Sequence, residues 1–164
     1  MTSSAAEASG VAPAADYHWR WASWSELSAR DVHDFLKLRS EIFVVEQNCA
    51  YLDIDGLDPD CRHLLVRDAS GHLKGYLRLL PPGLNRSEPA LGRLVVAESE
   101  RGTGLGRAVM LEGIRICSAA APTHAIYIHA QQHLQAFYES LGFRPASDMH
   151  LEDGIPHIDM LRQP

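Results

Sequence analysis

The chain has 164 residues and a mass of 18.1 kDa, the size of one domain that can bury a core without a disulfide or a metal. Its formal net charge is −6, from 15 basic and 21 acidic residues. This balance argues against nucleic acid as a partner, because such binding depends on Lys and Arg side chains that neutralise phosphates. No run of residues approaches the ~20 apolar residues of a membrane-spanning helix, so we expect no membrane partner either.

The N-terminal segment and the cysteines predict a cytoplasmic protein. Residues 1–16 are mostly small or polar, without basic residues or an apolar stretch, which predicts a disordered leader rather than a signal peptide. Residues 17–164 are expected to form a single domain. The chain has three cysteines, Cys49, Cys61 and Cys117. An odd number of cysteines without a CxxC pair is typical of reduced thiols.

The apolar pattern predicts an α/β fold with a mixed sheet, its elements in the chain order β-α-β-β-β-α-β-α-β-β. The expected strands cover residues 17–24, 63–68, 73–81, 91–96, 124–130, 149–152 and 158–161. The expected helices cover residues 28–46, 104–120 and 134–141. Ser28 and Asp31 form a capping box that opens the first helix. The acidic residues 53–59 resemble a calcium loop only at their start, so a solvated loop is the favoured interpretation.

A glycine-rich segment, RGTGLG at residues 101–106, lies between a predicted strand and a predicted helix. Its glycines allow a close backbone approach, and the amides at a helix N-terminus favour an anion such as a pyrophosphate. The P-loop and the dinucleotide-binding motif both require glycine where Arg107 stands, so neither fits. The pattern R/Q-x-x-G-x-G/A fits through Arg101, Gly104 and Gly106. A flexible turn without a ligand is the alternative.

In its context this segment resembles the coenzyme A loop of the GNAT N-acetyltransferase superfamily, and in particular its ElaA-like branch. The resemblance spans residues 17–164 and is carried by IFVVEQNCAYLDIDGLD at 42–58, LRLLP at 77–81, GRLVV at 92–96, RGTGLG at 101–106, IHAQQHLQAFYESLGF at 128–143 and LEDGIPHIDM at 151–160. It implies the GNAT acyl-CoA N-acyltransferase fold with splayed central strands. It also implies acetyl-CoA as co-substrate and direct acetyl transfer to a primary amine in a ternary complex.

The resemblance also implies roles for individual residues. The backbone of Leu94, Val95 and Val96 is expected to hold the pantetheine, with one N–H polarising the thioester carbonyl. Gln131 is a further expected cofactor contact. The pyrophosphate is expected on the loop residues Arg101, Gly102, Thr103, Gly104, Leu105, Gly106 and Arg107. Tyr138 is expected to protonate the departing thiolate. Its helical spacing also suits a core residue, and both can hold, because a buried ring can present its hydroxyl to a site.

The general base stays open among Glu46, Glu152 and His157, with His129 a fourth candidate. Glu46 ends the first predicted helix, which borders the acceptor site in the superfamily. Glu152 and His157 lie on the terminal hairpin, whose tip can close over the acceptor. A good hairpin turn explains Glu152 equally well.

Arg78 and Arg93 alternate with apolar residues on neighbouring predicted strands, which favours a solvated face; the alternative is that they hold a carboxylate of the acceptor. His129 and His133 are four residues apart but share no helix and lack a third ligand, so no metal is expected. The acceptor is expected to be a small-molecule or peptide amine, and a homodimer suits the resemblance. A non-catalytic acyl-CoA-binding or protein-interaction module is the alternative function.

Overall fold

The computed structural model describes residues 16–164, whose framework is an eight-stranded sheet in the order β1-β2-β3-β4-β5-β8-β6, with β7 paired to β8. The strands are β1 His18–Ser23, β2 Arg62–Arg67, β3 Leu73–Leu80, β4 Ala90–Val96, β5 Ile126–Gln131, β6 Arg144–Pro145, β7 His150–Glu152 and β8 Ile155–Arg162. The helices are α1 Ala29–Arg39, α2 Leu105–Ala120 and α3 Gln135–Glu139. The predicted mixed sheet is confirmed. The two-residue β6 was not predicted, because so short a strand carries no periodicity.

The predicted leader lies outside the described residues except for Asp16, which lies in a turn. Among residues 16–164, no helix is both long enough and apolar enough to pass through a bilayer.

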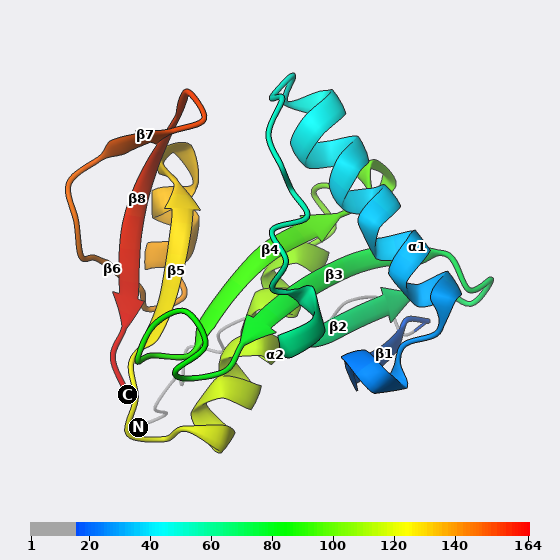
Figure 1. The fold of residues 1–164 in the computed structure, drawn as a ribbon, viewed down its shortest axis with the longest axis horizontal. Coiled ribbons are helices and arrows are strands. Elements are labelled where there is room, and N and C mark those ends of the chain that lie inside the picture. The colour runs from blue at the N-terminus through cyan, green and yellow to red at the C-terminus, as the bar shows by residue number, and fades with distance from the viewer. Residues whose placement is uncertain (1–15) are drawn as a thin grey trace, which may run out of the picture.

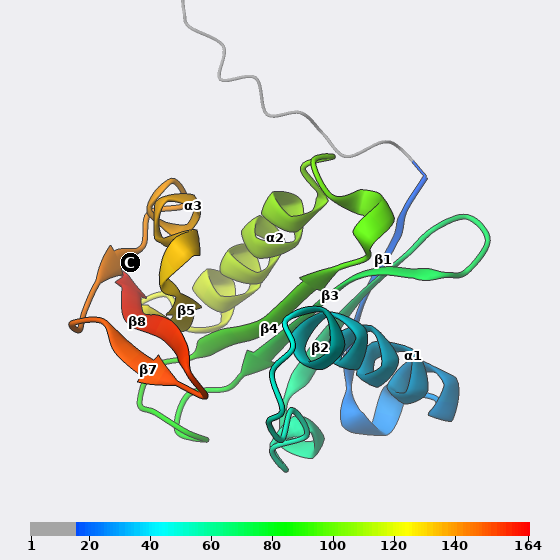
Figure 2. The ribbon, with the colours of Figure 1, turned by 90° about the horizontal axis from the view of Figure 1, so that it is seen from above.

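The two longer helices cover opposite faces of the sheet (Figure 2). Neighbouring residues of a strand point to opposite faces, so Leu77 packs under α2 whereas Tyr76 packs under α1 with Phe35. Gly113 lets α2 lie close to the sheet, because a Cβ there would come within 2.4 Å of the Leu77 Cδ2 atom. The middle of α2 therefore packs closely on β3 and β4, through Leu77 and Leu91.

The central strands diverge, as the resemblance implied. β4 and β5 run parallel but pair only at Ala90 and Tyr127, and beyond that point they separate (Figure 1). A register shift in the β3–β4 ladder leaves Arg93 and Leu94 opposite the single residue Leu77, and Arg93 has a φ of 53°. Such a bulge bends a strand and strengthens its twist. The edges of β4 and β5 consequently face an opening between them.

The first helix begins at the predicted capping box, where the Asp31 N–H donates to Ser28 Oγ at 3.1 Å. It ends differently from the prediction. After Arg39 the chain continues as a π-helical segment, Ser40–Glu46, closed by the Gln47 N–H donating to the Ile42 carbonyl at 3.3 Å. π-Helical turns are rare and often mark functional sites. The apolar spacing of the sequence predicts helix here but does not separate the two helical types.

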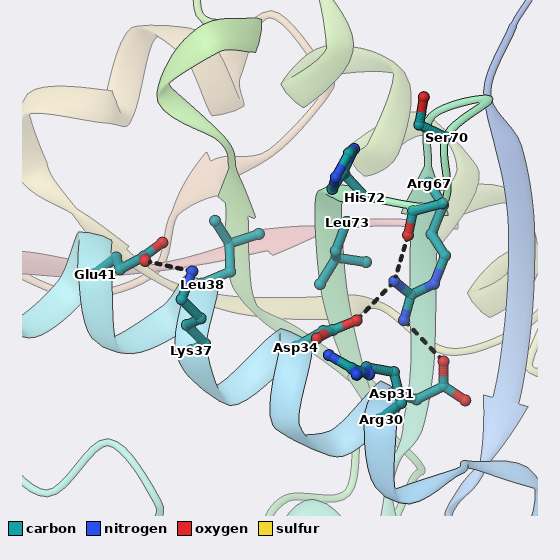
Figure 3. A pocket seen from close by; sticks show the side chains of 11 residues that line it. Arg30, Asp31, Asp34, Lys37, Leu38, Glu41, Arg67, Ser70, His72 and Leu73 are labelled. Carbon is teal, nitrogen blue, oxygen red and sulfur yellow. Dashed lines mark hydrogen bonds and ion pairs between the residues drawn. The ribbon is translucent and has the colours of Figure 1, made fainter.

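An outer hollow of about 500 Å³ lies between α1 and the β2–β3 turn (Figure 3). Its charged side chains neutralise one another, since Arg67 donates to Asp31 at 2.9 Å and to Asp34 at 2.8 Å. Arg67 also donates to the Gly71 carbonyl at 2.9 Å. These contacts tie the hairpin to α1, so the hollow is a structural junction.

His63 is fully buried between the sheet and α1 and makes stability depend on pH. Its Nδ1 lies 2.7 Å from the Tyr76 hydroxyl, its Nε2 lies 2.9 Å from the Asp58 carbonyl, and its ring stacks on Phe35. Burial lowers the pKa of His63. The unfolded chain therefore binds a proton more readily, so this contribution to stability is present above pH ~6.5 and is lost as the pH falls.

We therefore expect the free energy of unfolding to fall between pH 7 and pH 5, with His63 contributing up to about 1.4 kcal/mol per pH unit. Urea unfolding of the wild type and of His63→Gln measures this. The slope with pH should be smaller in the variant, whereas the exposed His124→Gln should keep the wild-type slope. Equal slopes for all three proteins would show that His63 does not titrate in this range.

Candidate active site

A cavity of about 1150 Å³ occupies the opening between β4 and β5. Its walls come from β4, the glycine loop, β5, α3, the β7–β8 turn and the segment after α1. It collects most of the predicted cofactor residues, namely Leu94, Val95, Val96, Arg101, Gly102, Gly104, Gly106, Arg107 and Gln131. Thr103 and Leu105 are outside the lining: the Thr103 hydroxyl donates to the Glu100 carbonyl at 2.6 Å, and Leu105 is buried in the core.

The glycine loop presents backbone donors to this cavity. Gly102 and Gly104 have φ values of 75° and 87°, which favour glycine, and Gly104 caps the 16-residue α2. Within residues 16–164, the N–H groups of Gly102, Gly104 and Gly106 have no hydrogen-bond acceptor. Free amides at the positive end of a helix dipole form an anion site.

Gly106 lies at the first turn of α2 and is not required by the fold. A Cβ at this position would lie 3.9 Å from Val96 Cγ1, an ordinary contact. Gly106 lines the same cavity as Gly102 and Gly104. The absence of a side chain therefore leaves room for a ligand against the helix N-terminus.

The two arginines of the loop are linked to neighbouring segments. Arg101 Nη2 lies 2.6 Å from both carboxylate oxygens of Glu46, and Arg107 Nη1 donates to Ser140 Oγ at 2.8 Å. Glu46 does not line the cavity, and its carboxylate is engaged by Arg101. Among the four candidate bases, Glu46 is thus the one that the fold holds away from the cavity.

Tyr138 combines a buried ring with a hydroxyl that no protein group uses. Its ring packs edge-on against Phe137 and Phe143, with centroids 5.0 and 6.1 Å away. The residue is 8% exposed and lines the cavity, and among the described residues its hydroxyl has no hydrogen-bond partner. Burial raises the pKa of Tyr138 to about 12. The hydroxyl therefore stays protonated at neutral pH and can donate a proton into the cavity.

The other three candidate bases lie together at the far end of the cavity. The rings of His129 and His157 stack with centroids 4.6 Å apart, and His129 Nε2 lies 3.8 Å from Glu152 Oε2. The His157 Nδ1–H donates to the Ile155 carbonyl at 2.7 Å, which leaves Nε2 with a lone pair. Burial, the largest effect, lowers the pKa of His157. The structure therefore places His129, Glu152 and His157 next to one another, and each stays a candidate for the general base.

The interpretation of Arg78 as part of a solvated face is wrong. Arg78 is 3% exposed, and its guanidinium donates to Asp55 at 2.7 Å and to Asp58 at 2.9 Å. Arg93 is partly buried, with its Nε 2.8 Å from Asp53 Oδ1. Both arginines line the cavity. Since carboxylates of the chain already engage them, a contact with an acceptor carboxylate stays a prediction.

The interpretation of residues 53–59 as a solvated loop holds only in part, because Asp53 and Asp58 are buried whereas residues 54–56 and 59 are exposed. Arg39 was not identified from the sequence. It is fully buried and donates to Asp53 at 2.8 Å and to Asp58 at 2.9 Å. One signal was present: Arg39 lies four residues after Phe35, on the apolar face of α1. A charged residue at a core position predicts a buried partner.

The three cysteines are buried and free. Burial raises the pKa of Cys61 to about 11 and that of Cys117 to about 12. Because the thiolate is the nucleophile, neither residue is reactive near neutral pH.

Known proteins match this chain over almost its whole length. The family model for the acetyltransferase (GNAT) domain matches residues 44–163. Protein ElaA of Escherichia coli is 41% identical over 147 residues, which cover 88% of this chain and 95% of ElaA. The crystal structure of E. coli ElaA superposes with a TM-score of 0.83 at 40% identity, covering 90% of this chain and 99% of that one. An acyl-CoA N-acyltransferase from Pseudomonas aeruginosa gives a TM-score of 0.85 at 38% identity, covering 89% and 99%.

Proposed function

Since this chain belongs to the GNAT family of acetyltransferases, we propose that it transfers the acetyl group of acetyl-CoA to a primary amine by direct attack in a ternary complex. The observation that carries the proposal is one cavity that contains both the free loop amides and the Tyr138 hydroxyl. An anion site and a proton donor in one cavity match a phosphorylated acyl donor with a thiolate leaving group.

The residues present fit such a donor. The amides of Gly102, Gly104 and Gly106 would hold the pyrophosphate, and the free edge of β4 at Leu94, Val95 and Val96 would hold the pantetheine. Acetyl-CoA supplies an activated acetyl group on a good leaving group. A β4 N–H is suited to polarise the thioester carbonyl, and positioning in the cavity supplies much of the rate enhancement.

Two proton movements complete the chemistry assigned to the chain. Tyr138 would protonate the departing sulfur, because its hydroxyl is protonated and otherwise unbonded. The attacking amine must lose a proton, and Glu152, His157 and His129 all line the cavity end where an acceptor would enter. Cys61 and Cys117 lie outside the cavity lining and have raised thiol pKa values, so neither supports an acyl-enzyme route.

Thermal unfolding with and without acetyl-CoA tests the donor half of the proposal. At about 100 times its Kd, the ligand should stabilise the fold by about 2.7 kcal/mol, a Tm increase of about 5–10 °C. Free coenzyme A should stabilise the protein as well, and ATP should not.

Gly106→Ala is the matched variant for this experiment. Without ligand it should unfold at or slightly above the wild-type temperature, because its Cβ meets no close contact and alanine favours the helix more than glycine does. With acetyl-CoA its stabilisation should shrink, since the Cβ would hold the pyrophosphate off the amides; a tenfold loss of affinity removes about 1.4 kcal/mol. No Tm change at millimolar acetyl-CoA would overturn the proposal. An undiminished shift in Gly106→Ala would overturn the loop assignment.

A further inference from the structure

Three strands at the C-terminal end of the chain place their polar side chains on one face. β5 pairs with β8, and β8 with β7, so that His129 lies opposite Asp159 and His150 lies opposite His157. Cross-strand partners share a face, and so do residues two apart on one strand. His129, His150 and Glu152 therefore lie together, whereas Ile128, Ile158 and Met160 point into the core.

We propose that this face binds one divalent cation of the zinc class through His129, His150 and Glu152. One ligand atom from each residue lies within 4.8 Å of the other two. Tetrahedral zinc at ~2.0–2.2 Å from each ligand atom needs these atoms roughly 3–4 Å apart. His129 Nε2 and Glu152 Oε2 are already 3.8 Å apart. Glu152 is exposed and His150 half-buried, so small side-chain rotations close the set.

The hydrogen bonds around His129 orient it as a metal ligand. His129 Nδ1 lies 2.9 Å from Asp159 Oδ1, which also accepts from the Tyr127 hydroxyl at 2.8 Å. A carboxylate can only accept, so Nδ1 carries the hydrogen and Nε2 keeps the lone pair that faces Glu152. A carboxylate behind a ligating histidine fixes its tautomer and raises its basicity, and this arrangement recurs at zinc sites.

The ligand set decides the class of ion. Two imidazoles and one carboxylate suit zinc and neighbouring transition metals, whereas magnesium and calcium prefer oxygen ligands alone. Three protein ligands leave a fourth position open toward the cavity, which His129 and Glu152 both line. His157 stacks on His129 outside the set. His133, the partner considered from sequence spacing, is not part of it.

Metal binding at this site does not depend on acetyl transfer, but it would affect the candidate bases for that reaction. An ion at this position would occupy the lone pairs of His129 and Glu152. Metal binding and a general-base role are therefore mutually exclusive uses of these two residues.

Direct binding to the full chain, after removal of metals with a chelator, tests the site. We expect calorimetric titration with Zn²⁺ to give one ion per chain. His150→Ala and Glu152→Gln should each weaken binding at least tenfold. Asp159→Asn should weaken it about 10–100-fold through the lost orientation of His129. The exposed His124→Ala should bind as the wild type does, and thermal melts of the metal-free variants exclude misfolding as the cause.

Co²⁺ provides a spectroscopic readout of the ligands. Visible d–d bands with no sulfur-to-cobalt charge-transfer band are expected, because the site contains no thiolate. A charge-transfer band would overturn the proposal in favour of a cysteine site. Binding that is not stoichiometric, or that His150→Ala and His124→Ala affect equally, would overturn it as adventitious.

Discussion

Tyr138→Phe should lower kcat by about 10²–10⁴-fold, the usual contribution of a positioned general acid. The Kd for acetyl-CoA should stay the same, because the ring keeps its packing against Phe137 and Phe143. Stability should change little, since no protein group bonds to the lost hydroxyl among the described residues. Initial rates with saturating acetyl-CoA and amine, together with a binding titration, separate the two effects.

The matched control is Tyr17→Phe, which removes a hydroxyl that donates to Glu100 and does not line the cavity. It should keep the wild-type kcat. A Tyr138→Phe protein that retains half of the wild-type kcat would remove the acid role from Tyr138 while leaving cofactor binding intact. The raised pKa of Tyr138, about 12, further predicts that wild-type kcat shows no loss between pH 6 and pH 9 through this group.

The geometry of the candidate donor half could be predicted because its signals are local. The glycines at 102, 104 and 106 are adjacent in sequence to the helix that follows them. The spacing of Tyr138 along its own helix predicts a buried ring, and such a ring can still present its hydroxyl to a cavity. Backbone amides at a helix N-terminus need no distant partner to form an anion site. The same locality explains why the capping box at Ser28 was predicted correctly.

The contacts within the candidate acceptor half could not be predicted, although several of its residues were named from the sequence, because these contacts join residues far apart in the chain. His150 lies beside His129 only because of the register in which β5, β8 and β7 pair, and the spacing of residues in the sequence does not predict that register. Arg39 meets Asp58 across 19 residues that change from helix to loop. A buried ion pair needs both partners in place before either charge is tolerated in the core. The position of Arg39 on the apolar face of α1 therefore predicts a buried partner, but it does not identify Asp58 as that partner.

We expect the largest loss of stability when the buried ion pairs of Asp58 with Arg39 and Arg78 are removed. Asp58 is 4% exposed, and its Oδ1 accepts from Arg39 and from Arg78, each at 2.9 Å. Asp58→Asn leaves two buried guanidiniums without this shared charge, which should cost about 3–5 kcal/mol of unfolding free energy. The Tm should fall by about 10 °C or more. The exposed Asp60→Asn, two residues away, should change stability by less than about 0.5 kcal/mol.

The pH dependence separates loss of the charge from loss of packing. Burial raises the pKa of Asp58, but Arg39 and Arg78 outweigh it, so the folded pKa lies below the ordinary value. The contribution of Asp58 to stability is therefore present above pH ~4 and is lost as the pH falls further. Asp58→Asn should consequently flatten the acid limb of the stability curve, measured by urea unfolding from pH 6 to pH 3. An acid limb as steep as that of the wild type, or a destabilisation no greater than that of Asp60→Asn, would show that the arginines do not depend on this carboxylate. Because Arg78 also lines the cavity, the charge that stabilises the core is the one that holds this wall of the candidate acceptor site in place.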